Sequence, residues 1–231
     1  MADGVTGGGT EAVSRPARTE SERLDLSLKA MKVVRHDLRN LLASVTIIAD
    51  RIAALEDTRL AAAGPHLVTS MEQTVALSRA AQELCEVAPG SPETLALGGV
   101  ASDAVDSVEG AKVSFEGLEG VSVKGDREQL RRLFAHLIDN AMRATGPDGS
   151  VTLSAVPGPQ AVTLTLSDTG QGVPDYAFAD LLVPFAGAKR RGGTGLGLPI
   201  AASLAAANGG ELHVERSGAD GTVVIVTLPS P

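Results

Sequence analysis

A heptad pattern in the first part of the chain limits its fold more than any other feature. Apolar residues recur in alternating steps of four and three from Leu24 to Ile52, and Arg35 fills the one gap. This pattern predicts one amphipathic helix, roughly 55 Å long, that ends at about Asp57. A weaker stripe over residues 66–87 predicts a second helix, with Pro65 as its first residue after a loop at 58–65.

Two long helices joined by a short loop form a hairpin whose apolar stripe is largely uncovered. Pairing with a second copy would bury this stripe in a four-helix bundle, so residues 20–88 are predicted to form a homodimer. Residues 1–19 are rich in glycine and polar residues, and we expect them to form a disordered tail.

The sequence changes in character after a linker rich in proline and glycine at residues 88–92. Strands are predicted at 94–97, 112–115, 121–124, 151–156, 161–167, 211–215 and 222–228, and helices at 100–108, 126–145 and 198–207. This order favours an α+β two-layer sandwich over residues 93–229, rather than a doubly wound parallel sheet. The residues of helix 126–145 expected in the core are Leu130, Leu133, Phe134, Leu137, Ile138 and Ala141.

Composition excludes several classes of function. A net charge of −8 and only 2% aromatic residues argue against binding to nucleic acid or an anionic membrane. The single cysteine, Cys85, excludes an internal disulfide and suits a reducing compartment. Because no apolar run approaches the ~20 residues that span a bilayer, and the N-terminus has no signal-peptide pattern, we expect a cytoplasmic protein without membrane insertion.

A glycine-rich run, GGTGLGLPIA at residues 192–201, precedes a predicted helix. Glycines let backbone N–H groups approach a ligand closely, and such groups at a helix start bind phosphate. A P-loop is excluded because no Gly-Lys-Ser or Gly-Lys-Thr occurs, and a Rossmann loop because no strand precedes the run. Taken alone, the run is also compatible with an ordinary structural turn.

Two polar residues have the right chemistry for a nucleotide. Asn140 lies within a predicted helix, and its side-chain oxygen is a suitable Mg²⁺ ligand. Asp168 follows a predicted strand and precedes Thr-Gly-Gln-Gly, where its carboxylate is able to accept a hydrogen bond from an exocyclic amine. The ordinary alternatives are a surface asparagine and an aspartate that begins a turn.

His36 lies beside the heptad stripe, at its solvent-facing edge. Asp37 follows it directly, and Asn40 lies one helical turn further on the same face. An exposed imidazole next to a carboxylate is a candidate nucleophile. The alternative is a plain surface histidine.

The order of these segments carries a resemblance to a known family. RHDLRNLL (residues 35–42), HLIDNA (136–141), DTGQG (168–172) and GGTGLGLPIA (192–201) resemble the H, N, G1 and G2 boxes of two-component sensor histidine kinases. The last three segments also resemble those of the wider GHKL ATPase superfamily. The resemblance covers about residues 20–229 and implies a dimerisation and phosphotransfer hairpin followed by a catalytic ATP-binding domain.

The resemblance implies a role for each matching residue. His36 would accept a phosphoryl group, Asp37 would assist its transfer, and Asn40 would orient water when a partner is dephosphorylated. Asn140 would bind Mg²⁺, and Asp168 would bind the adenine amine. The other residues expected around ATP are Arg143, Gly170, Gly172, Lys189, Gly193, Thr194, Gly195, Leu196 and Gly197.

The chain also departs from the family pattern. His136 stands where the family commonly has a first asparagine, so metal binding rests more on the second one. Ala144 replaces a frequent aromatic residue near the base, and Leu41 replaces a frequent proline. Leu182 replaces the first phenylalanine of the F box, while Phe185 retains the second.

These features predict a histidine kinase that uses ATP and Mg²⁺ to phosphorylate His36 and then passes the phosphoryl group to an aspartate of a response-regulator receiver domain. Dephosphorylation of that partner through Asn40 is a secondary hypothesis. Two alternatives stay open. One is a GHKL-type protein-serine kinase, which would not need His36. The other is a non-catalytic histidine phosphotransfer or scaffold protein.

Overall fold

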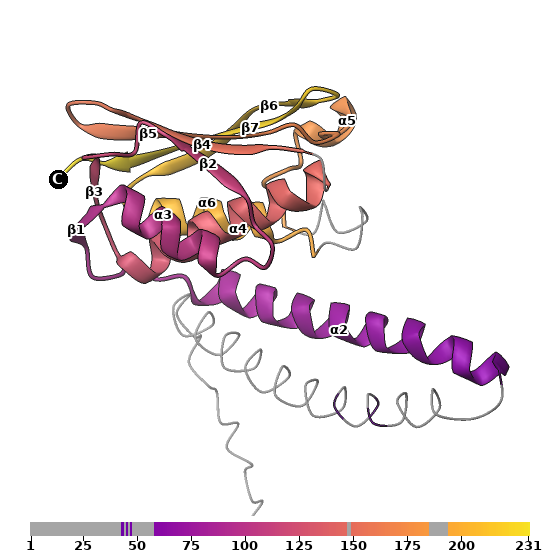
Figure 1. Ribbon diagram of the computed structural model, residues 1–231. Helices are drawn as coiled ribbons and strands as arrows, with labels where there is room; N and C mark the ends of the chain where they lie inside the picture. The colour runs from indigo at the N-terminus through magenta and orange to yellow at the C-terminus, as the bar shows by residue number, and fades with distance from the viewer. Residues whose placement is uncertain (1–42, 44, 46, 48–57, 147–148, 185–193) are drawn as a thin grey trace, which may run out of the picture.

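The computed structural model describes residues 43, 45, 47, 58–146, 149–184 and 194–231. Within these residues, a five-stranded sheet lies on a layer of three helices, and the long helix α2 extends beneath that layer (Figure 1). The predicted α+β architecture of the second half is confirmed. The tail and most of the first predicted helix lie outside the described residues, although Ala43, Val45 and Ile47 are helical.

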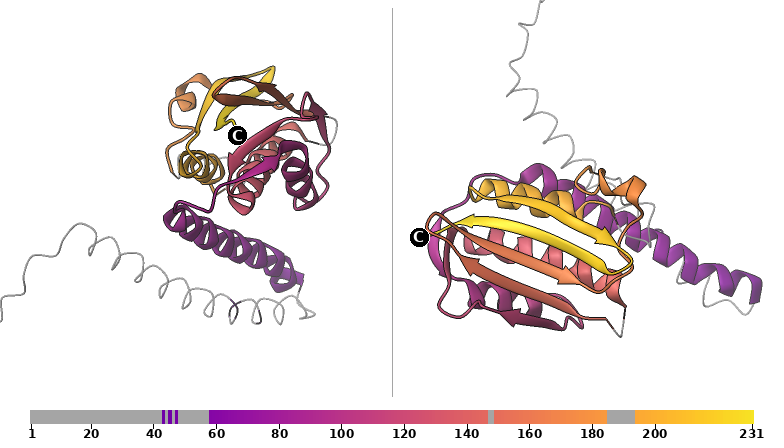
Figure 2. Two further views of the ribbon diagram at one scale, coloured as in Figure 1. Left: turned by 90° about the vertical axis from the view of Figure 1, so that its left-hand side faces the viewer. Right: turned by 90° about the horizontal axis from the view of Figure 1, so that it is seen from above.

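The main sheet has the strand order β2-β4-β5-β7-β6, in which β2 and β4 are parallel and all other neighbours are antiparallel. Figure 2 shows the helices on one face of this sheet only, which distinguishes the fold from a doubly wound one. The strands are β2 (Val113–Glu116), β4 (Val151–Pro157), β5 (Ala161–Asp168), β6 (Glu211–Gly218) and β7 (Gly221–Pro229). A separate antiparallel pair joins β1 (Glu93–Ala96) and β3 (Ser122–Gly125).

The helix layer contains α3 (Leu97–Asp106), α4 (Arg127–Thr145) and α6 (Gly197–Ala207). Helix α4 begins after Asp126, whose carboxylate accepts a hydrogen bond from the backbone N–H of Gln129 (3.0 Å) and so caps the helix. All six residues predicted for its core face are buried, as the periodicity of 3.6 requires. The full set is Leu130, Leu133, Phe134, Leu137, Ile138 and Ala141.

Helix α2 spans Thr58–Glu86, which corrects two predictions. The expected loop at residues 58–65 is helical, and Pro65 lies inside the helix rather than at its first position. Proline lacks an N–H and therefore removes one helical hydrogen bond. The residues just before it, Leu60–Ala63, are strong helix formers, and they continue the helix across the Gly-Pro pair.

The C-terminal part of α2 packs onto the sandwich. Ala80, Ala81 and Leu84 of this helix and Val87 just after it contact the hydrophobic core of the sheet and helix layers. Helix α2 and the sandwich are therefore packed together through apolar side chains. None of the helices in the part of the chain described here is long and apolar enough to cross a membrane.

The short helix α5 (Asp175–Phe178) was not predicted, because four residues are too few for a helical periodicity to be visible.

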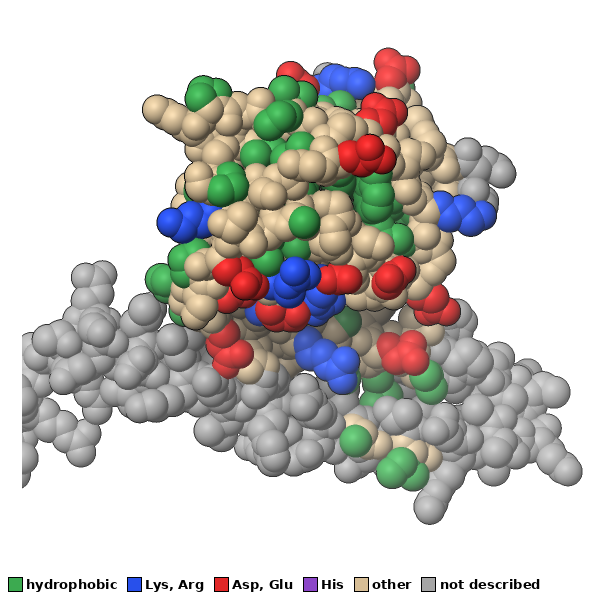
Figure 3. Space-filling view, turned by 60° about the vertical axis from the view of Figure 1, so that its left-hand side comes forward, with side chains coloured by type: hydrophobic (Ala, Val, Ile, Leu, Met, Phe, Trp, Pro, Cys, Tyr) green, Lys and Arg blue, Asp and Glu red, His purple; other side chains and the backbone are tan. Residues whose placement is uncertain are grey.

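On the face shown in Figure 3, acidic and basic side chains mix in one band. Exposed pairs such as Arg127–Asp103 (3.2 Å) and Arg131–Glu128 (2.6 Å) account for charges of this kind. Such pairs contribute little to stability, since water screens them.

Candidate functional site

Asp168 is placed by the alternation of strand β5. Val162, Leu164 and Leu166 point toward the helix layer and are buried, and the period of two puts the Asp168 side chain on the same face at the strand end. The aspartate is only 6% exposed. A carboxylate thus lies at the edge of an apolar core, where an unpaired charge is costly.

Two backbone N–H groups partly compensate that charge. Oδ1 of Asp168 accepts hydrogen bonds from Gly170 (2.8 Å) and from Thr222 on the neighbouring strand β7 (3.3 Å). Burial raises the pKa of the Asp168 carboxyl, while these two bonds act in the opposite direction. Both bonds use Oδ1, so among the described residues Oδ2 remains available as an acceptor for a ligand amine.

The loop after Asp168 requires glycine at two positions. A Cβ on Gly170 would lie 2.6 Å from the backbone carbonyl carbon of Ala144, at the end of helix α4. Gly172 has φ +56°, and a Cβ there would collide with the backbone of Gly218 on β6. The loop is therefore held between α4 and β6 at contact distances that only glycine permits.

The segment before helix α6 reaches α4 from the other side. Leu196 is fully buried, and its N–H donates to Thr194 Oγ1 (3.3 Å). Gly195 has φ +69°, and α6 begins at Gly197, whose missing Cβ would lie 4.0 Å from the carbonyl oxygen of His136. The N-terminus of α6 thus lies beside α4. The N–H groups of Gly197 and Leu198 there are suited to an anion, whereas Pro199 has no N–H and that of Ile200 donates to Leu196.

Helix α4 brings these two segments together. It contacts Gly170 at Ala144 and Gly197 at His136, and Asn140 lies one helical turn from each of them. The side chain of Asn140 is exposed. Three groups therefore lie along one stretch of α4. They are Asp168 as an acceptor for a base, the N-terminus of α6 for phosphate, and the side-chain oxygen of Asn140 for a cation.

Arg143 follows Asn140 on α4, but its guanidinium is engaged. Its Nε lies 3.0 Å and 2.9 Å from the two carboxylate oxygens of Asp139. Both side chains are largely exposed, so the pair is weak and a phosphate would be able to displace the carboxylate. The predicted residues His36, Asp37, Asn40, Lys189 and Gly193 lie outside the described residues, as do Leu41 and Phe185.

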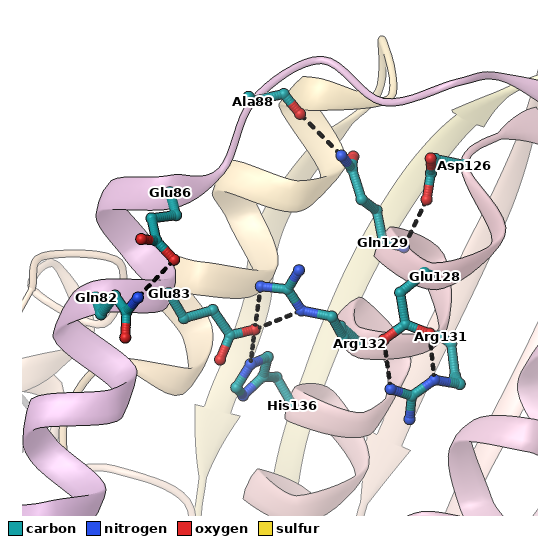
Figure 4. A network of polar contacts seen from close by, with 10 residues as sticks. All are labelled: Gln82, Glu83, Glu86, Ala88, Asp126, Glu128, Gln129, Arg131, Arg132 and His136. Carbon is teal, nitrogen blue, oxygen red and sulfur yellow. Dashed lines mark hydrogen bonds and ion pairs between the residues drawn. The ribbon is translucent and has the colours of Figure 1, made fainter. Parts of the chain in front are cut away.

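The structure also contains a polar contact that the sequence did not reveal (Figure 4). Glu83 points from α2 toward α4, where its Oε1 lies 2.7 Å from Nη2 of Arg132 and 2.9 Å from Nε2 of His136. Burial raises the pKa of Glu83, but the hydrogen bonds and charges of His136 and Arg132 outweigh this effect and lower it from 4.5 to about 2. The residues lie 49 and 53 positions apart, so no local pattern connects them.

His136 replaces an asparagine that the family commonly has near the expected metal site. In this structure its side chain bonds to Glu83 instead. Its ring is occupied by Glu83 and is only 24% exposed. His136 thus connects α2 to α4, the helix that carries Asn140.

The sequence and fold of the chain are similar to those of known proteins. The profile of the family described as "Histidine kinase-, DNA gyrase B-, and HSP90-like ATPase" matches residues 125–231. The sensor protein DivL of Caulobacter vibrioides is 39% identical over 107 residues, which cover 46% of this chain and 14% of DivL. The sensor protein CutS of Streptomyces coelicolor is 34% identical over 175 residues, 69% of this chain and 40% of CutS.

The signal transduction histidine-protein kinase BaeS of Escherichia coli is 28% identical over 86% of this chain and 46% of its own length. The chain spans less than half of each of these three curated relatives. Among solved structures, full-length ShkA in complex with AMPPNP has a TM-score of 0.67 at 21% identity, over 87% of this chain and 46% of ShkA. The histidine kinase AdeS of Acinetobacter baumannii has a TM-score of 0.58 at 20% identity, over 84% of this chain and 98% of AdeS. These structures share the fold.

Proposed function

Residues 125–231 match the profile of the histidine kinase-, DNA gyrase B- and HSP90-like ATPase family, and from this premise we propose that the chain is a histidine kinase core that transfers the γ-phosphoryl group of ATP to His36. The observation that carries the proposal is the arrangement on helix α4. Asn140 lies between the Asp168 loop and the N-terminus of α6, which contact the helix at Ala144 and His136.

The adenine end of ATP fits the Asp168 loop. The free Oδ2 would accept a hydrogen bond from the exocyclic amine of adenine, and the raised pKa of Asp168 reflects a buried site in which that bond is strong. Gly170 and Gly172 let this loop pack directly against the backbone of α4 and β6, which fixes the position of Asp168 for the base. Guanine carries a carbonyl at the matching position and would meet a carboxylate with no proton to share.

The phosphate end fits the start of α6. The free N–H groups of its first turn, beginning at Gly197, and the exposed Arg143 would bind phosphate oxygens, together with Lys189, Gly193, Thr194, Gly195 and Leu196 as predicted from the sequence. In the described part of the chain, no group of three acidic, histidine or cysteine side chains is able to hold a metal ion. A Mg²⁺ ion would therefore be shared between Asn140 and the phosphates, whose charge it would neutralise.

The acceptor chemistry would take place on the predicted helical hairpin. The His36 imidazole would attack the γ-phosphorus while ADP leaves, and Asp37 would accept the ring proton. A receiver-domain aspartate would then attack the phosphorus and release the imidazole. Asn40 would orient the water that hydrolyses the resulting acyl phosphate. Response regulators are the partners that the two-component relatives BaeS and CutS suggest.

The apolar stripes of the hairpin support pairing of two chains. Val45 and Leu77 lie on the predicted stripes and are 38% and 36% exposed in the single chain. A second copy would cover them, which gives a homodimer. Light scattering on the full chain tests the dimer, and a monomer would count against the dimer.

The single cysteine and the need for ATP support a cytoplasmic location.

Labelling with γ-phosphate tests the central proposal. The full chain is incubated with labelled ATP and Mg²⁺, beside the His36→Ala variant and the control His213→Ala, which changes an exposed histidine on β6. We expect an acid-labile label on the wild type and on His213→Ala and none on His36→Ala. Label retained by His36→Ala would overturn the proposal. Acid-stable label on a partner serine would favour the serine-kinase alternative. A chain that binds no ATP analogue but accepts phosphate from a phosphorylated receiver would favour the scaffold alternative.

A further inference from the structure

Two hydroxyl groups face each other at the end of the β6–β7 hairpin. Ser217 and Thr222 are register partners, and their oxygens lie 2.8 Å apart. Thr222 is buried and Ser217 is half-buried. These two hydroxyls satisfy one another, as polar groups removed from water require, because buried polar groups are costly unless bonded.

Each member of this pair holds one end of the loop after β5. At the start of the loop, the N–H of Thr222 donates to Oδ1 of Asp168 (3.3 Å). At its end, the N–H of Val173 donates to Oγ of Ser217 (3.0 Å). The hydroxyl–hydroxyl bond links the two attachments into one chain, so the hairpin holds the loop at both ends.

The backbone between these attachments lies directly on the hairpin. Gly172 leaves no room for a Cβ against Gly218, and Gly221 leaves none against the carbonyl oxygen of Asp168. The close approach sets where Val173 lies. Among the described residues, Ser217 Oγ is the acceptor that its N–H reaches, so an alanine at 217 would leave that N–H without a protein partner.

We propose that Ser217 is a positioning residue for recognition of the base, which it serves by fixing the loop at Val173 while Thr222 fixes Asp168. This inference rests on the proposed function, in which ATP places its adenine at Asp168. Ser217 acts through the loop backbone, so its loss would move Oδ2 of Asp168 and the loop residues Gly170 and Gly172 relative to one another. The orientation of the Asp168 carboxylate, which distinguishes the amine of adenine from the carbonyl of guanine, would then be less well defined.

The test compares Ser217→Ala with Ser217→Thr, which keeps the hydroxyl and suits a strand. The control is Ser154→Ala on β4, whose hydroxyl donates, within the described part of the chain, to the carbonyl of Thr165 across the same sheet (3.4 Å). Calorimetry on the full chain measures the affinity for ATP and for GTP, each with Mg²⁺. We expect Ser217→Ala to bind ATP about fivefold more weakly and to lose part of its preference for ATP over GTP. Ser217→Thr and Ser154→Ala should match the wild type.

Amide hydrogen exchange in the nucleotide-free chain gives a second readout. The amide of Val173 should exchange faster in Ser217→Ala, while that of Leu164, on the central strand β5, should not change. Wild-type affinities and an unchanged ATP preference in Ser217→Ala would overturn the inference. So would equal weakening of ATP and GTP with faster exchange throughout the sheet, since that marks a general loss of stability. Absence of ATP binding by the wild type would overturn the proposed function itself, and this inference with it.

Discussion

Oε1 of Glu83 lies 2.9 Å from Nε2 of His136, so a carboxylate of α2 is bonded to the helix that carries Asn140. Arg132, one turn earlier on α4, contacts the same oxygen at 2.7 Å. Two donors from helix α4 therefore share one acceptor from helix α2. Together with Leu84 and Val87, this contact sets how α2 lies on the sandwich.

Removing the Glu83 charge should destabilise the chain in a pH-dependent way. The lowering of its pKa from 4.5 to about 2 corresponds to about 3 kcal/mol. Screening of the partly exposed Arg132 reduces this to about 2 kcal/mol for Glu83→Gln at pH 7. Since the folded-state pKa is lowered, the stabilisation is complete above pH 4.5 and is lost as the pH falls toward 2. Urea unfolding of both proteins between pH 7 and pH 3 measures the difference.

The matched control for this prediction is Glu72→Gln, an exposed glutamate on the same helix. It removes the same charge, and we expect its free energy of unfolding to stay within about 0.5 kcal/mol of the wild type. A difference between Glu83→Gln and wild type that stays constant on acidification would contradict the assignment of the effect to the ionised carboxylate.

Asp168→Asn should separate ligand binding from stability. The amide oxygen can still accept from Gly170 and Thr222, but the amide nitrogen then faces the adenine amine, so ATP should bind at least about tenfold more weakly. Because the folded-state pKa of Asp168 is raised, its ionised form costs stability above that pKa, and this cost disappears as the pH falls through it. The variant should therefore be as stable as the wild type or more stable at neutral pH. Calorimetry and thermal unfolding measure the two effects, and a variant that loses both would argue for a structural role.

Two glycines of the β6–β7 hairpin should respond differently to alanine. Gly221 has φ +105°, and a Cβ there would collide with the carbonyl oxygen of Asp168, so Gly221→Ala should cost about 2–4 kcal/mol. A Cβ on Gly218 meets nothing within 4 Å, and Gly218→Ala should change stability by less than about 0.5 kcal/mol. Chemical denaturation of the two variants measures both values, and equal losses would show that the close approach at Gly221 is unimportant.

Asn208 joins the end of α6 to the start of α4. Its Oδ1 accepts from the N–H of Asp126 (2.7 Å), and its Nδ2 donates to Gln129 (2.9 Å) and to the carbonyl of Leu204 (2.8 Å). Asn208→Ala leaves the Asp126 N–H without this acceptor, and we expect a loss of about 2 kcal/mol in urea unfolding. Ser203→Ala, which among the described residues removes a bond to the carbonyl of Pro199 within α6, should cost less than half as much. A neutral Asn208→Ala would show that solvent replaces these bonds.

Local periodicity predicted much of the sandwich. The alternation of Val162, Leu164 and Leu166 predicted strand β5, and the spacing of three and four along residues 126–145 predicted the buried face of α4. Both patterns depend on neighbours within one element, so a single sequence contains them. The ends of these elements also agree with the structure to within a residue or two, since Asp126 and the glycines mark them.

Other features depend on contacts between distant segments. The prediction that a helix starts at Pro65 was wrong. The residues on both sides of Pro65 continue helix α2 through this position, although proline is unfavourable inside a helix. The partners Glu83 and His136 were invisible, since each is an ordinary polar residue until packing brings the two helices together. The same holds for Ser217 and Val173, which lie 44 residues apart.

By itself, the sequence determined the order of the elements, the faces that they bury and the residue types able to bind a nucleotide, because each of these follows from spacing within a short segment. The tertiary structure alone decided that Ala144 and His136 of one helix meet Gly170 and Gly197, and that Glu83 bonds to that helix. Those relationships arise only when the sheet and the helices pack into one core, since packing sets the distances between residues that the chain keeps far apart.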